Sequence, residues 1–321
     1  MESTIDITKY LLHSTIEEVI SSDTECSETS SIIGTDDYYL NTEKLVSYLS
    51  FNRTTQLLQD KLSYESKEVI ALIIDNLKGN YKSLFYGKNS NYFISDLIIK
   101  ANKIQKIQII KEIQKDLYKM CFNEFASHPV QTLIEKASSK EEIDLILHSF
   151  STKKKLLALC LDSNGTFVIR KVLVCLHENF RVKINELIMC NFHSLVLDKR
   201  GVCIIVKFIN SCESISTINH LIYIFANNII FFSTNEYSNY AVQALLSKKS
   251  PQSDSLALLL HCIMLNFKEL CNNRYGNYIV TIMLNYIDDD AKNLLYMSMK
   301  QDNADYSKYW KLVFNRLKSG F

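Results

Sequence analysis

The sequence predicts an all-α solenoid, in which a stack of about eight helical repeats forms one continuous body. A short pattern returns at intervals of 34 to 39 residues, and such periods are typical of solenoids whose units cannot bury their apolar faces alone. Only 7 Gly and 2 Pro occur in 321 residues, which argues against a loop-rich all-β fold. Apolar residues make up 47% of the chain and are sufficient for a substantial core.

The repeated pattern is a small residue, a polar residue, usually a flat side chain, apolar residues and a second polar residue. Its clearest copies are SNYFISDLI, NGTFVIRKVL, SNYAVQALL and GNYIVTIML, which start at Ser90, Asn164, Ser238 and Gly276. The successive intervals between first polar residues are 39, 36, 39, 36, 37, 38 and 34 residues. These first polar positions are Asn52, Asn91, Ser127, Thr166, Val202, Asn239, Asn277 and Lys311.

The chain is expected to divide into a tail and a repeat domain. Residues 1–36 include a stretch rich in Ser, Thr and acidic residues with little apolar periodicity, which indicates a flexible N-terminal tail. Residues 37–321 carry the helical pattern almost without a break and form the predicted repeat domain.

Each repeat is expected to contain a periodic apolar helix, a short polar turn and a second helix. Residues 67–77 (KEVIALIIDNL) are typical of the first helix, and residues 233–237 (STNEY) are typical of the turn. The second helix carries the repeated pattern. Acidic residues that precede second helices are expected to cap them, namely Asp162, Asp198 and Glu236.

The pattern gives the second helix two different faces. Asn239 and Gln243 lie four residues apart and therefore share one face, while Tyr240 points about 100° around the helix. The residues three and six places after the first polar position are apolar in nearly every repeat, with Thr55 the polar exception. The apolar stripe is expected to be buried, which leaves the polar and flat stripe to face solvent or a ligand.

Composition excludes several classes of protein. The 36 basic and 35 acidic residues give a net charge of +1, so no global basic field is present. No apolar run of about 18 residues indicates a membrane helix, and no signal peptide is visible. We expect a monomeric protein of the cytoplasm, with the nucleolus as the alternative.

No enzymatic or metal site is expected. The sequence has no Gly-rich phosphate loop and no GxSxG, HExxH or clustered carboxylate pattern, so we predict no catalytic residue and no cofactor. Cys190 and His193 form a lone CxxH without a second pair at zinc spacing, so we predict no metal. The nine cysteines, scattered through apolar patterns, are interpreted as buried free thiols.

The five-residue core resembles that of the Pumilio (PUF) repeat family, and SNYAVQ at residues 238–243 is close to a full match. The resemblance spans roughly residues 37–321. It implies a right-handed α-solenoid that forms a curved arc of eight repeats and binds single-stranded RNA on its concave face. In such repeats two side chains contact the edge of one base and a third stacks between neighbouring bases.

The resemblance assigns one stacking position to each repeat, directly after the first edge position. Six of the eight stacking residues are aromatic, imidazole or guanidinium groups, which lie flat on a base: Arg53, Tyr92, His128, Phe167, Tyr240 and Tyr278. The other two are Cys203 and Leu312.

The edge-reading residues implied by the resemblance form six pairs, each four residues apart: Asn52 and Gln56, Asn91 and Ser95, Ser127 and Gln131, Thr166 and Arg170, Asn239 and Gln243, and Asn277 and Thr281. In the family's code an Asn–Gln pair prefers uracil and a Ser–Gln pair prefers adenine. Asn91 keeps half of a uracil pair, and Thr166 with Arg170 resembles a cytosine reader, although Arg170 could instead contact phosphate.

The remaining repeats are poorer readers. Asn277 with Thr281 departs from the family's guanine reader, and Val202 with Val206 has no hydrogen-bonding group. Lys311 with Asn315 cannot be assigned. Family members bind RNA antiparallel, so the expected site, from its 5′ end, is an unassigned base, weak uracil, uracil, any base, cytosine or any base, adenine, a uracil-leaning position and uracil.

The resemblance implies that the protein binds 3′ untranslated regions of messenger RNA and recruits translational-repression or deadenylation proteins. Two alternatives stay open at this point. One is a divergent PUF protein that grips the RNA backbone during rRNA processing and ribosome assembly, and the other is a protein-binding α-solenoid without RNA activity.

Overall fold

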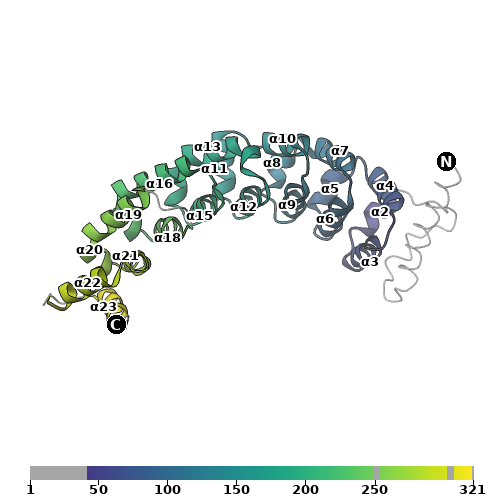
Figure 1. The fold of residues 1–321 in the computed structure, drawn as a ribbon. Coiled ribbons are helices and arrows are strands. Elements are labelled where there is room, and N and C mark those ends of the chain that lie inside the picture. The colour runs from purple at the N-terminus through teal and green to yellow at the C-terminus, as the bar shows by residue number, and fades with distance from the viewer. Residues whose placement is uncertain (1–41, 249–253, 302–306, 320–321) are drawn as a thin grey trace, which may run out of the picture. The chain divides into compact units, whose positions relative to one another are not determined.

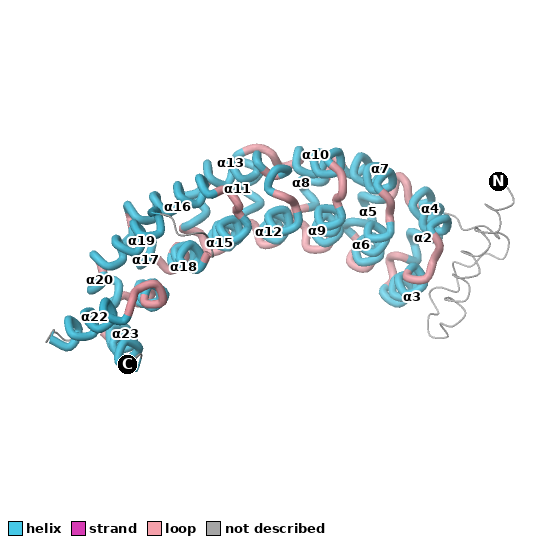
Figure 2. The backbone as a smooth tube through the Cα atoms, viewed as in Figure 1, coloured by secondary structure: helices cyan, strands magenta, loops and turns pink. Residues whose placement is uncertain are grey.

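The computed structural model describes residues 42–248, 254–301 and 307–319. The predicted tail of residues 1–36 lies outside this part of the chain. Every regular element within these ranges is a helix, as Figures 1 and 2 show. The chain forms two compact units: residues 1–155 with 162–180, and residues 156–161 with 181–321. No helix in the described ranges has the length and apolar character needed to cross a membrane.

Unit 1 contains the first four repeats. Its pattern-bearing helices, called reader helices below, are α3 (Asn52–Leu62), α6 (Ser90–Lys100), α9 (Ser127–Lys136) and α12 (Gly165–Cys175). Each packs against the next, so that the four form one row. The other elements are α2 (Thr42–Tyr48), α4 (Lys67–Asn76), α5 (Tyr81–Tyr86), α7 (Lys103–Ile113), α8 (Leu117–Met120), α10 (Lys140–His148), the start of α11 (Lys153–Leu161) and the 3₁₀ helix η1 (Glu178–Phe180).

Unit 2 contains the last four repeats. Its reader helices are α15 (Gly201–Ser211), α18 (Asn239–Ser247), α21 (Gly276–Met283) and α23 (Lys308–Ser319), and they also pack in sequence. The other helices are α13 (Val182–Cys190), α14 (Phe192–Val196), α16 (Ile215–Asn227), α17 (Ile229–Thr234), α19 (Asp254–Leu265), α20 (Phe267–Asn272) and α22 (Asp289–Gln301).

The core of each unit lies between its reader helices and its first helices. In α6, Ile94 and Leu97 of the predicted apolar stripe are fully buried, as are Ile205 and Phe208 of α15. Unit 2 adds an aromatic cluster in which the rings of Phe225 and Phe232 are 4.7 Å apart. The prediction of a buried stripe along each reader helix is therefore confirmed at these positions. The first polar residues, such as Asn91 and Asn239, are also buried, contrary to the expectation that they face solvent or a ligand, and the flat residues that follow them are exposed.

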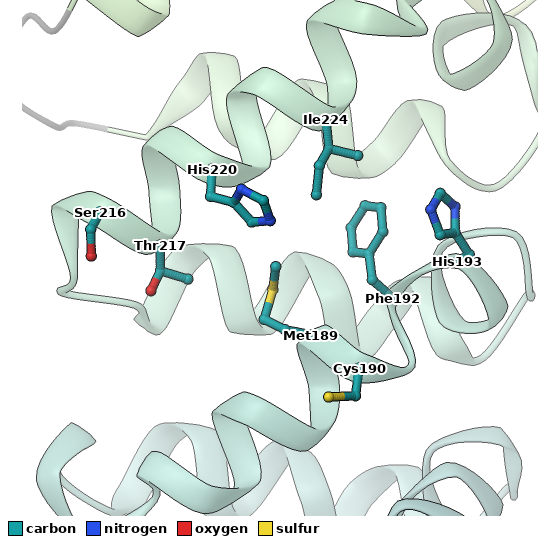
Figure 3. A pocket seen from close by; sticks show the side chains of 8 residues that line it. All are labelled: Met189, Cys190, Phe192, His193, Ser216, Thr217, His220 and Ile224. Carbon is teal, nitrogen blue, oxygen red and sulfur yellow. The ribbon is translucent and has the colours of Figure 1, made fainter.

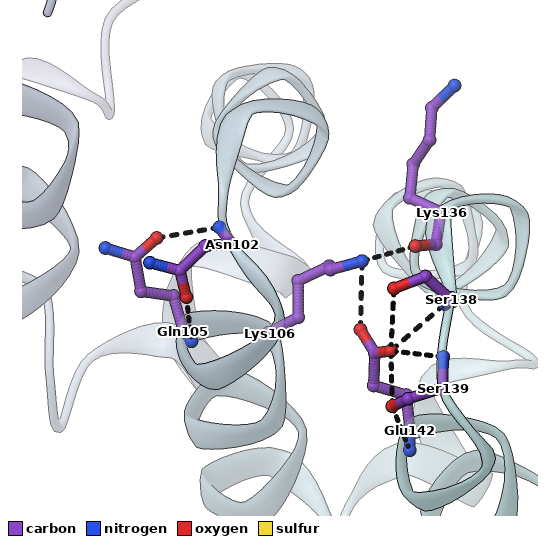
Figure 4. A network of polar contacts seen from close by, with 7 residues as sticks. All are labelled: Asn102, Gln105, Lys106, Lys136, Ser138, Ser139 and Glu142. Atoms are coloured by element: carbon purple, nitrogen blue, oxygen red, sulfur yellow. Dashed lines mark hydrogen bonds and ion pairs between the residues drawn. The ribbon is translucent and has the colours of Figure 1, made fainter. Parts of the chain in front are cut away.

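A buried ion pair joins two first helices of unit 1 (Figure 4). Lys106 Nζ of α7 lies 2.9 Å from Glu142 Oε1 of α10, and both side chains are almost fully buried. Lys106 also donates to the backbone carbonyl of Lys136, at the end of reader helix α9. The Glu142 Oε2 atom accepts from the backbone N–H of Ser139 at 2.7 Å and of Ser138 at 3.0 Å. The pair thus ties the end of one repeat to the beginning of the next.

The cysteines follow the prediction of burial only in part, since Cys121, Cys160, Cys212 and Cys271 are buried. In Cys121 and Cys160, burial raises the pKa of each thiol to about 12. Cys175, Cys190 and Cys203 are exposed instead. Exposed positions on the helices alternate with buried ones, and the apolar pattern around a cysteine does not by itself fix its side of the helix.

Candidate nucleic-acid interface

Most reader helices begin after a tight turn built by an Asp or Asn side chain. Asp162 Oδ1 accepts from the backbone N–H of Asn164 at 2.9 Å and of Gly165 at 2.8 Å. Four other turn residues accept the same two bonds, from the backbone N–H groups two and three residues later. They are Asn123, Asp198, Asn235 and Asn273. Asp162 and Asp198 were expected to cap the helices, but they form the turn instead, two residues before the N-cap residues Asn164 and Arg200. In the sixth repeat Asn235, and not the predicted Glu236, forms this turn. The turn residue stands four places before the first edge position and fixes where the reader helix starts.

The small residue of the pattern is required by a close backbone approach. Ser238 Oγ donates to the backbone carbonyl six residues earlier, that of Phe232, at 2.7 Å, and Ser90 does the same to Leu84 at 2.8 Å. A Cβ atom built on Gly201 would lie 2.5 Å from the carbonyl oxygen of Leu195, again six residues earlier. The preceding short helix therefore leaves no room for a Cβ atom at Gly201, whereas Ser90 and Ser238 use a hydroxyl that donates to the equivalent carbonyl.

The asparagines at the first edge position are held by the turn. Asn91 Nδ2 donates to the carbonyls of Gly87 at 2.8 Å and Lys88 at 2.7 Å. The equivalent bonds of Asn239 are 2.8 and 3.0 Å long, and those of Asn277 are 3.0 and 2.7 Å long. With the amide nitrogen engaged twice, each side chain offers its Oδ1 atom as the acceptor. Asn91 Oδ1 is buried and has no hydrogen-bond partner in the described part of the chain.

The second edge residues differ among repeats in what they offer. Gln243 Nε2 donates to Asn239 Oδ1 at 2.8 Å, so the two amides form a connected pair. The hydroxyls of Ser95 and Thr281 instead donate to their own helices, to the carbonyls four residues earlier, at 2.9 and 2.8 Å. These two repeats therefore present mainly acceptors at both edge positions.

The hydroxyl residues at the first edge position are also buried. Ser127 and Thr166 are both less than a tenth exposed, and Thr166 Oγ1 donates to the Asp162 carbonyl at 2.6 Å. Gln131 is half-buried and Arg170 is exposed. The Arg170 guanidinium lies 5.8 Å from the ring centroid of Phe167 in the same repeat. This contact places its charge beside the stacking position.

The rings at four stacking positions are exposed on their reader helices. Tyr92, Phe167, Tyr240 and Tyr278 are 55, 53, 58 and 56% exposed, large values for apolar rings. The rings of Tyr92 and His128, from consecutive repeats, are nearly parallel, with centroids 6.1 Å apart and planes at 27°. A base inserted between the two rings requires a separation of about 7 Å between them, which is twice the usual contact distance between carbon atoms. The two rings therefore need to separate by only about 1 Å.

Two repeats lack a full reader. In α15, Val202 is buried and Cys203 is exposed at the stacking position, so this repeat has no edge-reading group and no planar ring. In α23, Lys311 and Asn315 are exposed, and Leu312 is 60% exposed at the stacking position.

In the first repeat, the structure places the edge and stacking positions three residues later along the chain than the sequence alignment does. Thr55 Oγ1 donates to the Phe51 carbonyl four residues earlier at 2.7 Å, as Thr166 does in the fourth repeat. Thr54 donates to the Tyr48 carbonyl six residues earlier, the bond that Ser90 and Ser238 make at the small position. Thr55 thus occupies the first edge position, Gln56 the stacking position and Gln59 the second edge position.

Contacts between repeats support this register. Asn89, two residues before the first edge position of its repeat, donates to the carbonyl of Ser50 at 2.7 Å. Asn164, at the equivalent place, donates to the carbonyl of Phe122 at 2.8 Å. Phe122 lies five residues before Ser127, and Ser50 lies five residues before Thr55. Asn52 and Arg53 consequently lie one turn before the edge and stacking positions, and Gln56 lies at the stacking position instead of the second edge position.

A pocket of about 470 Å³ lies elsewhere in unit 2, between α13, α14 and α16 (Figure 3). It is lined by Met189, Cys190, Phe192, His193, Ser216, Thr217, His220 and Ile224. None of these residues belongs to a reader helix. No group of three or more His, Cys, Asp or Glu side chains suited to a metal ion occurs among the described residues.

Comparison with known proteins identifies relatives of this chain. No family model matches the sequence. Pumilio homolog 9 of Arabidopsis thaliana is 22% identical over 254 residues, which cover 78% of this chain and 43% of that protein. Suppressor protein MPT5 of Saccharomyces cerevisiae is 26% identical over 229 residues, which cover 67% of this chain and 26% of that protein. The chain thus spans less than half the length of these relatives.

Solved structures show the same fold. A crystal structure of PUF-8 in complex with PBE-RNA has a TM-score of 0.78 at 15% identity and covers 96% of this chain and 89% of that chain. The RNA-binding domain of yeast Puf5p bound to AAT2 RNA has a TM-score of 0.68 at 20% identity and covers 86 and 84%. The chain is thus similar in sequence to Pumilio proteins and has the fold of their RNA-binding domains. The predicted α-solenoid of Pumilio-type repeats is confirmed.

Proposed function

We propose that this protein binds single-stranded messenger RNA in a sequence-selective manner, with one base on each competent reader helix. The observation that carries the proposal is the exposed ring beside a fixed polar pair, which recurs on consecutive reader helices in each unit. The similar structures of Puf5p and PUF-8 contain RNA, and a further relative is named Fem-3 mRNA-binding factor 1. These names support the proposal for the present chain.

The fixed amides supply base selectivity. A buried acceptor without a partner, such as Asn91 Oδ1, costs about 1–3 kcal/mol. A base that donates an N–H to this atom recovers the loss, whereas a base with an acceptor there adds repulsion. Because the amide nitrogen is already engaged by two turn carbonyls, the side chain is oriented before RNA binds.

The rings supply most of the affinity. Stacking of a base on an aromatic side chain contributes about 1–3 kcal/mol. Tyr92 and His128 already lie nearly parallel and need little movement to accept a base. Their pre-organisation lowers the ordering cost of binding.

The shifted first repeat changes the proposed target at its 3′ end. Thr55 with Gln59 is a hydroxyl–amide pair of the same type as Ser127 with Gln131, so this repeat is assigned to adenine instead of uracil. The fifth repeat, with Val202 at its first edge position, remains a position without base preference.

Selection from a random RNA pool tests the proposal. An enriched sequence whose length and preferences follow the reader helices is the expected result. The double substitution Asn239→Ser and Gln243→Glu should move the preference at one base from uracil toward guanine. Enrichment without any base preference, or a variant that selects the same sequence, would refute the assignment of the edge readers.

The first-repeat register has its own test. Gln59→Ala should relax selectivity at the 3′-terminal base and weaken binding by about 1–3 kcal/mol, the usual value of a base-edge contact. Asn52→Ala, one turn earlier on the same helix, is the matched control and should leave selectivity unchanged. The opposite outcome would restore the register of the sequence alignment.

The proposed cellular role follows from RNA binding. A protein of this kind would act in the cytoplasm on 3′ untranslated regions of messenger RNA, as a monomer that recruits repression or deadenylation proteins. Binding, rather than catalysis, is the proposed activity. Altered translation of a reporter that carries the selected sequence, only when the protein is present, is the expected result in cells.

A further inference from the structure

Lysines gather at three turns of unit 1. The turns join the first helix of a repeat to the following short helix. Together with the first residues of those short helices, they comprise residues 77–82, 114–119 and 149–155. They contain one carboxylate, Asp116, and seven lysines, which we call the lysine edge: Lys78, Lys82, Lys115, Lys119, Lys153, Lys154 and Lys155. The three equivalent turns of unit 2 contain only Lys268 and Glu269 as charged residues. In a chain of net charge +1, this concentration is a local feature.

The three turns form one continuous strip. Lys82 Nζ lies 3.0 Å from Asp116 Oδ2, which connects the first turn to the second. Gln114 Nε2 lies 3.2 Å from Ser149 Oγ, which connects the second turn to the third. Lys155 Nζ also lies 5.0 Å from the ring centroid of Tyr118.

Most of the positive charge on this strip is uncompensated. The carboxylate of Asp116 is already paired with Lys82. One further carboxylate, that of Glu112 on α7, reaches the first turn, where it accepts from the backbone N–H groups of Gly79 at 2.9 Å and Tyr81 at 3.0 Å. The exposed side chains of Lys78, Lys115, Lys119 and Lys154 form no ion pair within the described residues. By contrast, Lys136 and Lys171 on the reader helices of the same unit both pair with Glu135, at 3.2 and 2.6 Å.

Short helices connect the strip to the reader helices. The short helices α5, α8 and α11 each lead from the lysine edge to a reader helix. Helices of this length, 4 to 9 residues, span only about 6–14 Å. Tyr118 contacts the ring of Phe122 at 5.1 Å, and the Phe122 carbonyl accepts from Asn164 at the start of α12.

We propose that the lysine edge binds the phosphodiester backbone of RNA that flanks the bases held by the reader helices. This inference rests on the proposed RNA binding. A row of exposed ammonium groups, of which those of Lys78, Lys115, Lys119 and Lys154 form no ion pair within the described residues, is complementary to a flexible polyanion. Such contacts add affinity without regard to sequence. The edge therefore strengthens binding to long RNA and leaves base preference unchanged.

The test compares a selected RNA with one nucleotide per repeat and the same RNA extended at both ends by oligoadenylate. The variant is Lys115→Gln, Lys119→Gln and Lys154→Gln together. The matched control is Lys67→Gln, Lys103→Gln and Lys140→Gln, which removes the same charge from the first residues of α4, α7 and α10, at the opposite ends of these helices. Circular dichroism verifies that both variants are folded.

The wild-type protein should bind the extended RNA more tightly than the short RNA. The edge variant should lose this advantage and the control should keep it. Each lost phosphate contact lowers the slope of log affinity against log salt by about 0.7, or about 2 for three lysines. Between 50 and 200 mM salt, the wild-type protein should therefore lose about 20-fold more affinity than the edge variant.

Several results would overturn the proposal. Extension of the RNA could add nothing, or the control could lose as much affinity as the edge variant. Lysine-dependent binding to polyglutamate or anionic vesicles that exceeds binding to the extended RNA would assign the edge to another partner. If only the extended RNA binds, and its binding depends on the lysines, then the proposed base reading is refuted and the proposed role of the lysine edge is supported. If the short RNA binds normally and extension adds nothing, only the edge fails.

Discussion

The buried pair of Lys106 and Glu142 provides a sharp prediction about stability. Replacing Lys106 by Met keeps most of the volume and the apolar stem but removes the ammonium group. The carboxylate of Glu142 then loses its cation, and the carbonyl of Lys136 loses its charged donor. Removing one partner of a buried ion pair costs about 3–5 kcal/mol. Glu142 keeps its hydrogen bonds from Ser138 and Ser139, so the lower end, about 3 kcal/mol, is expected.

A neighbouring pair supplies the control. Lys111 and Glu141 lie on the same two helices, 3.2 Å apart, but both side chains are more than half exposed. Exposed pairs contribute about 0–1 kcal/mol, so Lys111→Met should have little effect. Urea unfolding followed by circular dichroism measures both variants. The double variant Lys106→Met and Glu142→Leu should be more stable than Lys106→Met alone, because no buried charge remains unpaired. Equal losses for Lys106→Met and Lys111→Met would refute the reasoning.

Three further predictions follow. Burial opposes ionisation of Glu142, but hydrogen bonds from Ser139 and Lys106 outweigh it and hold its pKa below the ordinary glutamate value. The ionised carboxylate therefore stabilises the fold at pH values above the ordinary glutamate pKa, and this contribution is lost as the pH falls through the folded-state pKa. The variant Glu142→Gln should flatten the acid limb of a curve of stability against pH. An unchanged acid limb would contradict this prediction. Gly201→Ala should destabilise the fold by about 1–3 kcal/mol in thermal unfolding, because the new Cβ meets the Leu195 carbonyl oxygen, and a neutral effect would contradict the close approach. Tyr240→Ala should weaken RNA binding by about 1–3 kcal/mol in a titration, whereas Tyr223→Ala, equally exposed on α16, should not.

Sequence reasoning reached the fold because apolar periodicity and a fixed repeat interval are local signals. It failed on the first repeat for a physical reason. Helix α3 begins at Asn52, one turn before its first edge position, while α6 begins at Ser90, directly before Asn91. The extra turn carries Asn52 and Arg53 and imitates the pattern. The sequence did contain a signal of the correct register. Thr55 was the polar exception in the apolar stripe, and a shift of three residues places Leu58 in that stripe instead of Thr55.

Contacts between repeats were beyond sequence reasoning. Lys106 and Glu142 are separated by 36 residues, and no local pattern indicates that their side chains meet. The lysine edge was missed for a similar reason, because Lys82, Lys115 and Lys154 are dispersed along the chain and the net charge conceals them. Only the stacked arrangement of repeats brings these side chains into one strip.

The hydrogen bonds of Asn91, Asn239 and Asn277 have a consequence for attempts to recode the protein. The amide at the first edge position, which is proposed to contact the base, also closes the turn at the start of its helix. Substitution there alters target choice and folding at the same time, and each new code carries its own stability penalty. The second edge position makes no bond to the turn at Gln243 or Ser95, whose partners lie within the reader helix. Directed evolution of new targets should therefore accumulate changes at the second position first, and reach the first only in variants that have stability to spare.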